Sequence, residues 1–261
     1  MSGAIPYIKK REFMERLVPG SPVFATVSTF NPDANTENNS VDGYASMTTY
    51  SSQVTANAAC VDAWSQARSG VGIGSDDVTN ALAITAYSYD VVFANPDWDC
   101  YIDILRAFVL FNTATLPDDA SITASDFKLY VIYKGNGDND GSDTINIVSS
   151  APVSSTAIVA GDYDSLGTTL YATAADITSV STGGYLTFAL NGTGLAAVSK
   201  TGVTKFGVRE GHDLANTRIA NSTSNDVGFS SADETGTSQD PVLEVTYTVS
   251  ATFSFGMWFP F

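Results

Sequence analysis

Two neighbouring stretches of the chain show the hydrophobic patterns of β-strands. Every position from Ala107 to Phe111 is apolar, which is typical of a strand that is covered on both faces. After a Leu-Pro-Asp-Asp break the pattern alternates, as in a strand with one buried face. That face is expected to hold Phe127, Leu129, Val131 and Tyr133. The two patterns together predict a layered all-β domain.

Similar runs along the chain predict an antiparallel β-sandwich of jelly-roll type. Ser, Thr, Val, Ala, Asp and Asn dominate the sequence, a balance that favours strands joined by turns. One or two helical turns are expected at 195–200, before Gly202. Further strands are expected at 23–30, 59–68, 81–93, 144–149, 185–190, 204–209 and 242–249.

The pattern divides the chain into a sandwich at 23–249 and two terminal segments. We expect residues 1–22 to form a short helix or an extension, and residues 250–261 to form an aromatic tail. Exposed large apolar side chains favour docking on another protein. The alternative for the tail is that it folds back on the core of its own domain. The alternative for the N-terminal residues is a solvated helix face. The assembly interface is predicted at Tyr7, Phe13, Met14, Leu17, Phe253, Phe255, Trp258, Phe259 and Phe261.

The charge and hydropathy of the sequence argue against nucleic acid as a partner and against a membrane span. The net charge of −16 repels nucleic-acid phosphates, so we expect no nucleic acid. The sequence contains no apolar run of the roughly 20 residues that a membrane span needs. Glu12, Glu15 and Arg16 interrupt the region where a secretory signal would be apolar. A surface protein without a secretion signal must leave the cell by another route, and we expect release inside an assembled phage particle. The alternative is that the sequence has been trimmed.

Several segments resemble one known family. They include Arg106-Ala-Phe-Val-Leu-Phe111 with the following Leu116-Pro117, Lys205-Phe-Gly-Val-Arg209, and Asp240-Pro-Val-Leu-Glu-Val245. This wording resembles the DNRLRE-type β-sandwich domains, the carbohydrate-binding module family 96 group, which occur in bacterial surface proteins and phage virion proteins. The resemblance spans most of the chain, but 31–58 and 97–103 match no family pattern. It implies a scaffold for display or binding, with no reaction attached.

We therefore expect a non-enzymatic structural protein of a phage-type virion, as a decoration, fibre or tail component. It would form homo-oligomers or bind other virion proteins. The alternative is a secreted or cell-surface carbohydrate-binding module, or a filament or adhesin subunit. A polysaccharide depolymerase is a third hypothesis, and it rests only on paired carboxylates such as Asp162 and Asp164, which are expected by chance among 28 acidic residues.

Aromatic residues in or near turns are candidates for stacking on sugar rings. Trp64 lies in a strand-like pattern and is expected in the core. With 12 tyrosines in the chain, a few exposed ones are expected without any ligand. The candidates for glycan binding are Tyr44, Tyr50, Tyr87, Tyr89, Trp98 and Tyr101.

A polar segment at 136–143 has alternating oxygen ligands and a central glycine, as calcium loops do. Ile147 stands where an EF-hand needs glutamate, so a looser Ca²⁺ site would use Asp138, Asp140 and Asp143. The alternative is a polar hairpin turn without metal. No other cofactor is expected.

His212 is the only histidine, next to Asp213. A catalytic triad would need a serine nucleophile, but the Gly-x-Ser-x-Gly pattern is absent, so a turn histidine is expected. Cys60 and Cys100 fit no zinc pattern. They can form one disulfide or remain two buried thiols, and the sequence leaves both open.

Overall fold

The computed structural model describes residues 25–32, 42–52, 56–77, 84–93, 99–233 and 236–249. The predicted docking residues of both terminal segments, as well as Trp98, lie outside this part of the chain. The strands are β1 (Ala25–Phe30), β2 (Asp42–Ser52), β3 (Gly74–Asp76), β4 (Ile84–Phe93), β5 (Asp99–Asn112), β6 (Ser121–Asn136), β7 (Thr144–Ser150), β8 (Leu166–Leu170), β9 (Ala175–Asp176), β10 (Gly184–Ala189), β11 (Val203–Glu210), β12 (Thr223–Phe229) and β13 (Val242–Thr248). The helices are α2 (Ala56–Ser69), α3 (Gly192–Ala197) and α4 (Gly211–Ala215), with 3₁₀ turns η1 (Ala160–Ser165) and η2 (Ile177–Ser179).

The predicted all-β sandwich is confirmed. Every strand pairing is antiparallel, and the main order is β1-β13-β6-β12-β4-β5-β11-β7-β8. In addition, β10 pairs with β6, β2 with β5 and β3, and β9 with β7. Among the described residues, no helix has the length and apolarity needed to cross a bilayer.

The main core lies between the layer of β13, β6 and β10 and the layer of β5, β11 and β7. The ring of Phe127 on β6 lies 5.7 Å from that of Phe111 on β5 and 5.1 Å from that of Phe206 on β11, centroid to centroid. Such aromatic contacts add to the free energy of burying each ring. They hold the two layers face to face.

A second core lies on the other face of β5, under α2. Alternate residues of β5 point to opposite faces, so Val109 joins the main core while Phe108 and Leu110 join the second. This explains why the run from Ala107 to Phe111 has no polar position, and its prediction as a doubly covered strand is confirmed.

The predicted strand at 59–68 is wrong, because these residues belong to helix α2. Its buried positions are Cys60, Ala63, Trp64 and Ala67. Their spacing of three and four residues places them on one helical face, against β5 and β2. Cys60 forms a disulfide with Cys100 of β5, with 5.4 Å between their Cα atoms. The helix is thus covalently joined to the sheet.

A bulge in β6 changes the predicted face of Tyr133. Val131 lies opposite Phe229 of β12, whereas Tyr133 lies opposite Gly228. Since Gly228 and Phe229 are consecutive, their partners point to opposite faces. Val131 is buried as expected, but Tyr133 is turned to the other side, where its ring packs over Gly228.

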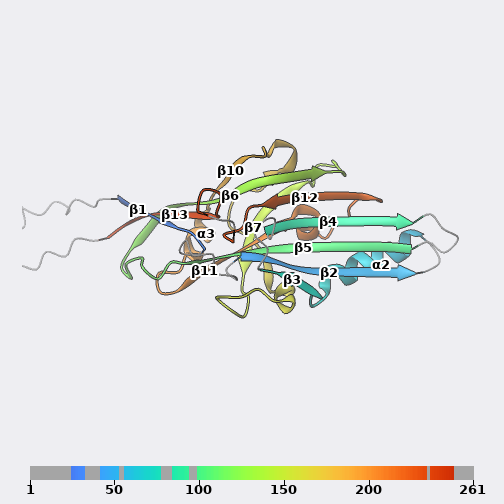
Figure 1. Ribbon diagram of the computed structural model, residues 1–261, viewed down its shortest axis with the longest axis horizontal. Coiled ribbons are helices and arrows are strands. Elements are labelled where there is room, and N and C mark those ends of the chain that lie inside the picture. Colours follow the sequence, from blue (N-terminus) through green and yellow to red (C-terminus); the bar gives the residue numbers. More distant parts are fainter. Residues whose placement is uncertain are drawn as a thin grey trace, which may run out of the picture.

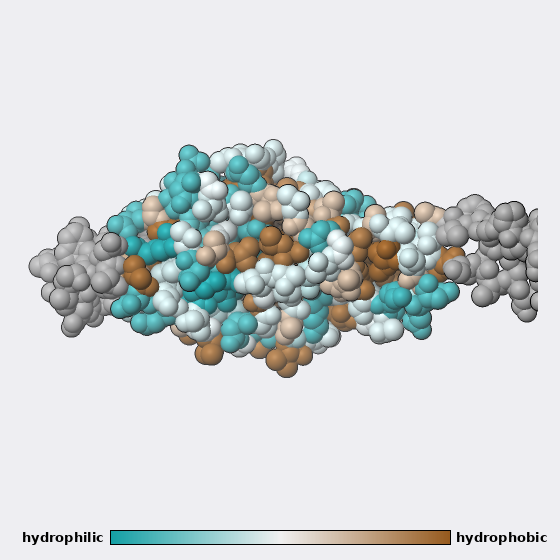
Figure 2. All heavy atoms as spheres, turned by 180° about the vertical axis from the view of Figure 1, so that it is seen from behind, coloured by the Kyte–Doolittle hydropathy of each residue, from teal (hydrophilic) through white to brown (hydrophobic). Residues whose placement is uncertain are grey.

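The molecule is elongated, and the start of β1 and the end of β13 lie at the same end of it (Figure 1). Ala25 at the start of β1 lies opposite Thr248 at the end of β13. The opposite end is built from β2, β4 and β5, with α2 behind them (Figure 1). Seen from the α2 side, hydrophobic residues form small patches separated by hydrophilic ones (Figure 2).

Candidate functional site

The predicted glycan-binding tyrosines that the structure describes lie on one face of β2, β5 and β4. Tyr50 on β2 is directly opposite Tyr101 on β5, and Tyr89 on β4 is directly opposite Asp103. Residues two apart on a strand share a face, so Tyr87 and Tyr44 belong to the same surface. We call this surface the tyrosine face; it comprises Tyr44, Tyr50, Tyr87, Tyr89, Tyr101, Asp103 and Thr48.

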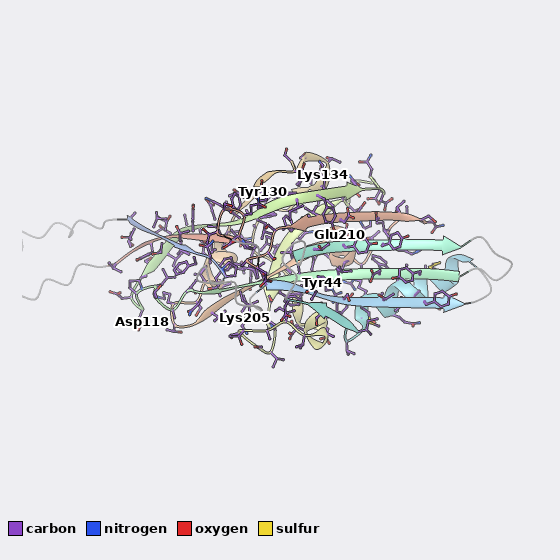
Figure 3. All side chains as sticks on the ribbon, in the orientation of Figure 1. Tyr44, Asp118, Tyr130, Lys134, Lys205 and Glu210 are labelled. Atoms are coloured by element: carbon purple, nitrogen blue, oxygen red, sulfur yellow. A yellow bond between two sulfur atoms is a disulfide. The ribbon has the colours of Figure 1, made fainter. Side chains whose placement is uncertain are left out.

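The rings of the tyrosine face are ordered against one another. The rings of Tyr87 and Tyr89 stack at 5.7 Å, and the ring of Tyr101 meets that of Tyr89 edge-on at 6.0 Å. Tyr50 is 59% exposed, and the other rings are half-buried. Figure 3 labels Tyr44 on this sheet, near the middle of the long axis. Three rings of this face thus pack against one another, and Tyr50 is exposed beside them.

Asp103 places a carboxylate among these rings. Its Oδ1 accepts a hydrogen bond of 2.8 Å from the Thr48 hydroxyl, and burial raises its pKa. Burial and the charge of Asp103 in turn raise the pKa of Tyr87 and of Tyr101. The face thus places phenol O–H donors beside the carboxyl oxygens of Asp103. Groups of both kinds can exchange hydrogen bonds with hydroxyl groups.

The face extends onto β12 and β6 through residues that the sequence did not reveal. Asp226 lies opposite Tyr87, and burial raises its pKa. In the neighbouring row of the sheet, Thr85 of β4 lies opposite Gly228 of β12, and Gly228 lies opposite Tyr133 of β6. The β6 bulge turns Tyr133 to this side of the sheet. Half-buried carboxylates with raised pKa values cost stability and are more common at binding sites than elsewhere.

A second group of polar residues surrounds His212, which was predicted to be a turn histidine. That prediction is wrong: His212 lies in α4 and is fully buried. Its Nε2 lies 3.1 Å from Asp138 Oδ2 and 3.4 Å from Asp140 Oδ1, at ion-pair distance from both carboxylates but without hydrogen-bond geometry. These three donor atoms all lie within 4.8 Å of one another. A cation placed among them would have three ligands.

The other side of the imidazole ring is held by Glu210. His212 Nδ1 lies 2.8 Å from Glu210 Oε1, and Ser88 donates a hydrogen bond of 2.7 Å to Glu210 Oε2. Burial lowers the pKa of His212, but the carboxylates of Glu210, Asp140 and Asp138 outweigh this effect and raise it to about 9. Figure 3 labels Glu210 near the middle of the molecule. The surroundings thus stabilise positive charge at the ring.

Of the predicted calcium ligands, the structure brings Asp138 and Asp140 together and leaves Asp143 apart. Asp143 accepts hydrogen bonds from the Asn225 amide and from the Gly141 backbone N–H. These bonds brace the turn between β6 and β7. His212 takes the third position beside Asp138 and Asp140. Calcium binding itself remains a prediction.

Next to this group lies a buried ion cluster with a structural role. Asp213 Oδ1 and Oδ2 accept two hydrogen bonds from Arg106, at 2.7 and 2.8 Å, and two from Arg209, at 2.8 and 2.7 Å. The Arg106 guanidinium lies 4.0 Å above the Tyr163 ring. Burial would raise the pKa of Asp213, but the two guanidiniums outweigh it and hold the pKa below its usual range.

We compared the chain with known proteins. No protein-family model matches it, and no curated protein does. The resemblance to the DNRLRE-type domains therefore stays a prediction that rests on the motifs alone. Two described features bear on function, namely the tyrosine face and the pairing of β1 with β13.

Proposed function

We propose that the chain is a non-enzymatic structural protein displayed on a phage-type virion, as a decoration, fibre or tail component. In this proposal the terminal segments attach the sandwich, and the tyrosine face points away from the particle. The observation that carries it is the pairing of β1 with β13, which places both ends of the sandwich side by side at one end of the molecule. A single attachment point then leaves the opposite end free.

The use of buried charges supports a non-enzymatic role. Three charged residues, Arg106, Arg209 and Asp213, are almost fully buried. Their side chains are hydrogen-bonded to one another, and the two arginines also donate to backbone carbonyls. Asp162, one of the candidate acidic residues for glycoside cleavage, is fully buried and accepts hydrogen bonds from the backbone N–H groups of Val153 and Val159. Such groups stabilise loops and are inaccessible to a polysaccharide.

Removal of residues 253–261 tests this proposal. The deletion removes the five aromatic side chains of the tail, so we expect assembly to be lost while the sandwich stays folded. Sedimentation velocity of the full chain and of the deletion measures assembly, and thermal unfolding measures the fold. Assemblies that survive the deletion would show that the tail is not the docking element. A full chain that stays monomeric at high concentration would contradict self-assembly.

The tyrosine face favours a second function, a carbohydrate-binding module of a secreted or cell-surface protein. Stacked and edge-on aromatic rings beside Asp103 suit a sugar, whose C–H groups pack on ring faces and whose hydroxyls bond to carboxylates. The Cys60–Cys100 disulfide suits an oxidising environment outside the cytoplasm. With a net charge of −16, the protein repels acidic polysaccharides, so the ligand class is a neutral or amino-sugar glycan.

Substitution of Tyr89 or Tyr101 by alanine tests the second function on a glycan array and by calorimetry. Each change should weaken binding tenfold or more, because a buried aromatic side chain contributes about 1.5–3 kcal/mol. Tyr130→Ala is the matched control, since its ring packs against Tyr185 on the β6–β10 pair instead of the tyrosine face (Figure 3). Equal affinity in all three variants, or silence across neutral and amino-sugar glycans, would contradict this function.

A further inference from the structure

We propose that Asp138, Asp140 and His212 form a binding site for one divalent transition-metal ion of the Zn²⁺ class. The three donor atoms come from two segments far apart in the sequence, namely the turn between β6 and β7 and helix α4. Bound metal would join the turn to the helix. The site differs from the calcium loop expected from the sequence in one ligand, a histidine nitrogen in place of the Asp143 carboxylate.

The first argument is the state of His212 Nε2. This nitrogen is fully buried, points into the group, and makes no hydrogen bond, although two carboxylate oxygens lie 3.1 and 3.4 Å away. A metal ion would replace the second ring proton on Nε2; Nδ1–H then donates a hydrogen bond to Glu210 Oε1, and the lone pair of Nε2 faces those oxygens. Three electron-pair donors then converge, an arrangement that needs a cation.

The second argument is the set of groups that orient the ligands. Asp138 Oδ2 accepts a hydrogen bond of 2.9 Å from the Ala220 backbone N–H, and Asp140 Oδ1 accepts one of 2.8 Å from that of Ser142. Glu210 holds the histidine ring from behind and is itself held by Ser88. A carboxylate behind a metal-binding histidine is the usual way in which proteins set the ring orientation and raise its basicity.

The third argument concerns which ion fits. Calcium takes six to eight oxygen ligands, whereas Zn²⁺ and its neighbours accept imidazole nitrogen and carboxylate oxygen in four-coordinate sites. The group offers two carboxylates and one imidazole, and the Asp143 carboxylate is engaged by Asn225 and Gly141. The side chain of Asp140 is 43% exposed, so a water molecule can reach the fourth position. This donor set favours Zn²⁺ over Ca²⁺.

The test is titration of chelator-treated full chain with Zn²⁺, and separately with Ca²⁺, followed by calorimetry and thermal unfolding. We expect one Zn²⁺ per chain and a thermal midpoint raised by about 5–10 °C at a free concentration of about 100 times the Kd. Ca²⁺ at the same concentration should leave the midpoint unchanged. Co²⁺ in place of Zn²⁺ should develop the visible absorption of a four-coordinate nitrogen–oxygen site.

Asp140→Asn is the principal variant, because the partly exposed side chain can be changed without opening the core. It should lose the Zn²⁺-dependent shift yet keep the midpoint of the metal-free protein. His212→Gln is the second variant and should abolish the Co²⁺ spectrum. Asp119→Asn, an exposed acid in another turn, is the matched control and should bind like the unchanged protein.

Two results would overturn the inference. If neither ion binds nor shifts the midpoint, Nε2 carries a proton and the group is an ion cluster around a charged histidine. If Ca²⁺ binds more tightly than Zn²⁺ and Asp143→Asn abolishes it while His212→Gln does not, the site is the oxygen-only calcium loop.

Discussion

Asp213→Ala is expected to destabilise the protein by about 3–5 kcal/mol, the cost of breaking a buried ion pair by removing one partner. The change leaves the guanidiniums of Arg106 and Arg209 almost fully buried without their shared carboxylate. Both side chains are also bonded to backbone carbonyls, so neither can turn to solvent without breaking further hydrogen bonds. Urea unfolding followed by circular dichroism measures the loss.

Two controls separate the ion cluster from a general effect of losing an acidic residue. Asp119→Ala removes an exposed carboxylate and should change stability by less than about 0.5 kcal/mol. Combining Asp213→Ala with Arg209→Met should cost less than the sum of the two single changes, because the double variant has one unpaired guanidinium fewer. A loss under 1 kcal/mol for Asp213→Ala, or strict additivity, would show that the cluster contributes little.

Replacing both Cys60 and Cys100 with serine is expected to lower stability by about 4 kcal/mol. The disulfide joins residues 40 apart, and the chain-entropy model gives this value for a closed loop of that length. It also ties α2 to β5, so its loss should affect the second core more than the main core. Hydrogen exchange of α2 and of β6 measures the two regions separately.

A reducing agent supplies the matched control for the disulfide. It should destabilise the unchanged protein by a similar amount and leave the double serine variant unaffected. If reduction leaves the urea midpoint of the unchanged protein where it was, or if α2 keeps its exchange protection, the disulfide does not hold the helix.

The local pattern of apolar and polar residues was sufficient to predict the strands that are buried on both faces or regularly on one face. The run from Ala107 to Phe111 is apolar because two cores cover it, and Leu243, Val245 and Tyr247 alternate because β13 buries one side. Helix α2 was missed, although the spacing of Cys60, Ala63, Trp64 and Ala67 carries a helical period. Small residues made that period hard to distinguish from a strand.

Features that depend on contacts between residues far apart in the chain could not be predicted from local sequence patterns. Strand β2 has few large apolar residues, so its identity comes from pairing with β5 along its whole length. The face of Tyr133 depends on a bulge that only the β12 partner defines. The sequence identified Asp138 and Asp140 as ligand candidates, but not that helix α4 would bring His212 to them.

The tyrosines of the candidate site were found from composition and position, and the structure brings together five of the six aromatic candidates, the sixth being the undescribed Trp98. Their register could not be derived, because a shift of one residue in β4 or β2 would have turned their rings to the opposite face. Asp103 and Thr48 gave no signal of their own. Asp103 gains its role because β5 lies between β2 and β4, and Thr48 because it lies opposite Asp103 on β2.

The pairing of β1 with β13 makes the resistance of the molecule to pulling depend on direction. A force that draws the two chain ends apart meets the β1–β13 hydrogen bonds one pair after another, starting at Ala25 and Thr248. A force between that end and the tyrosine face instead runs along β5 and β6, strands of 14 and 16 residues, and shears many hydrogen bonds at once. In the proposed display on a particle, a load between the tyrosine face and this end would act as shear, whereas a force that separates β1 from β13 would act by peeling.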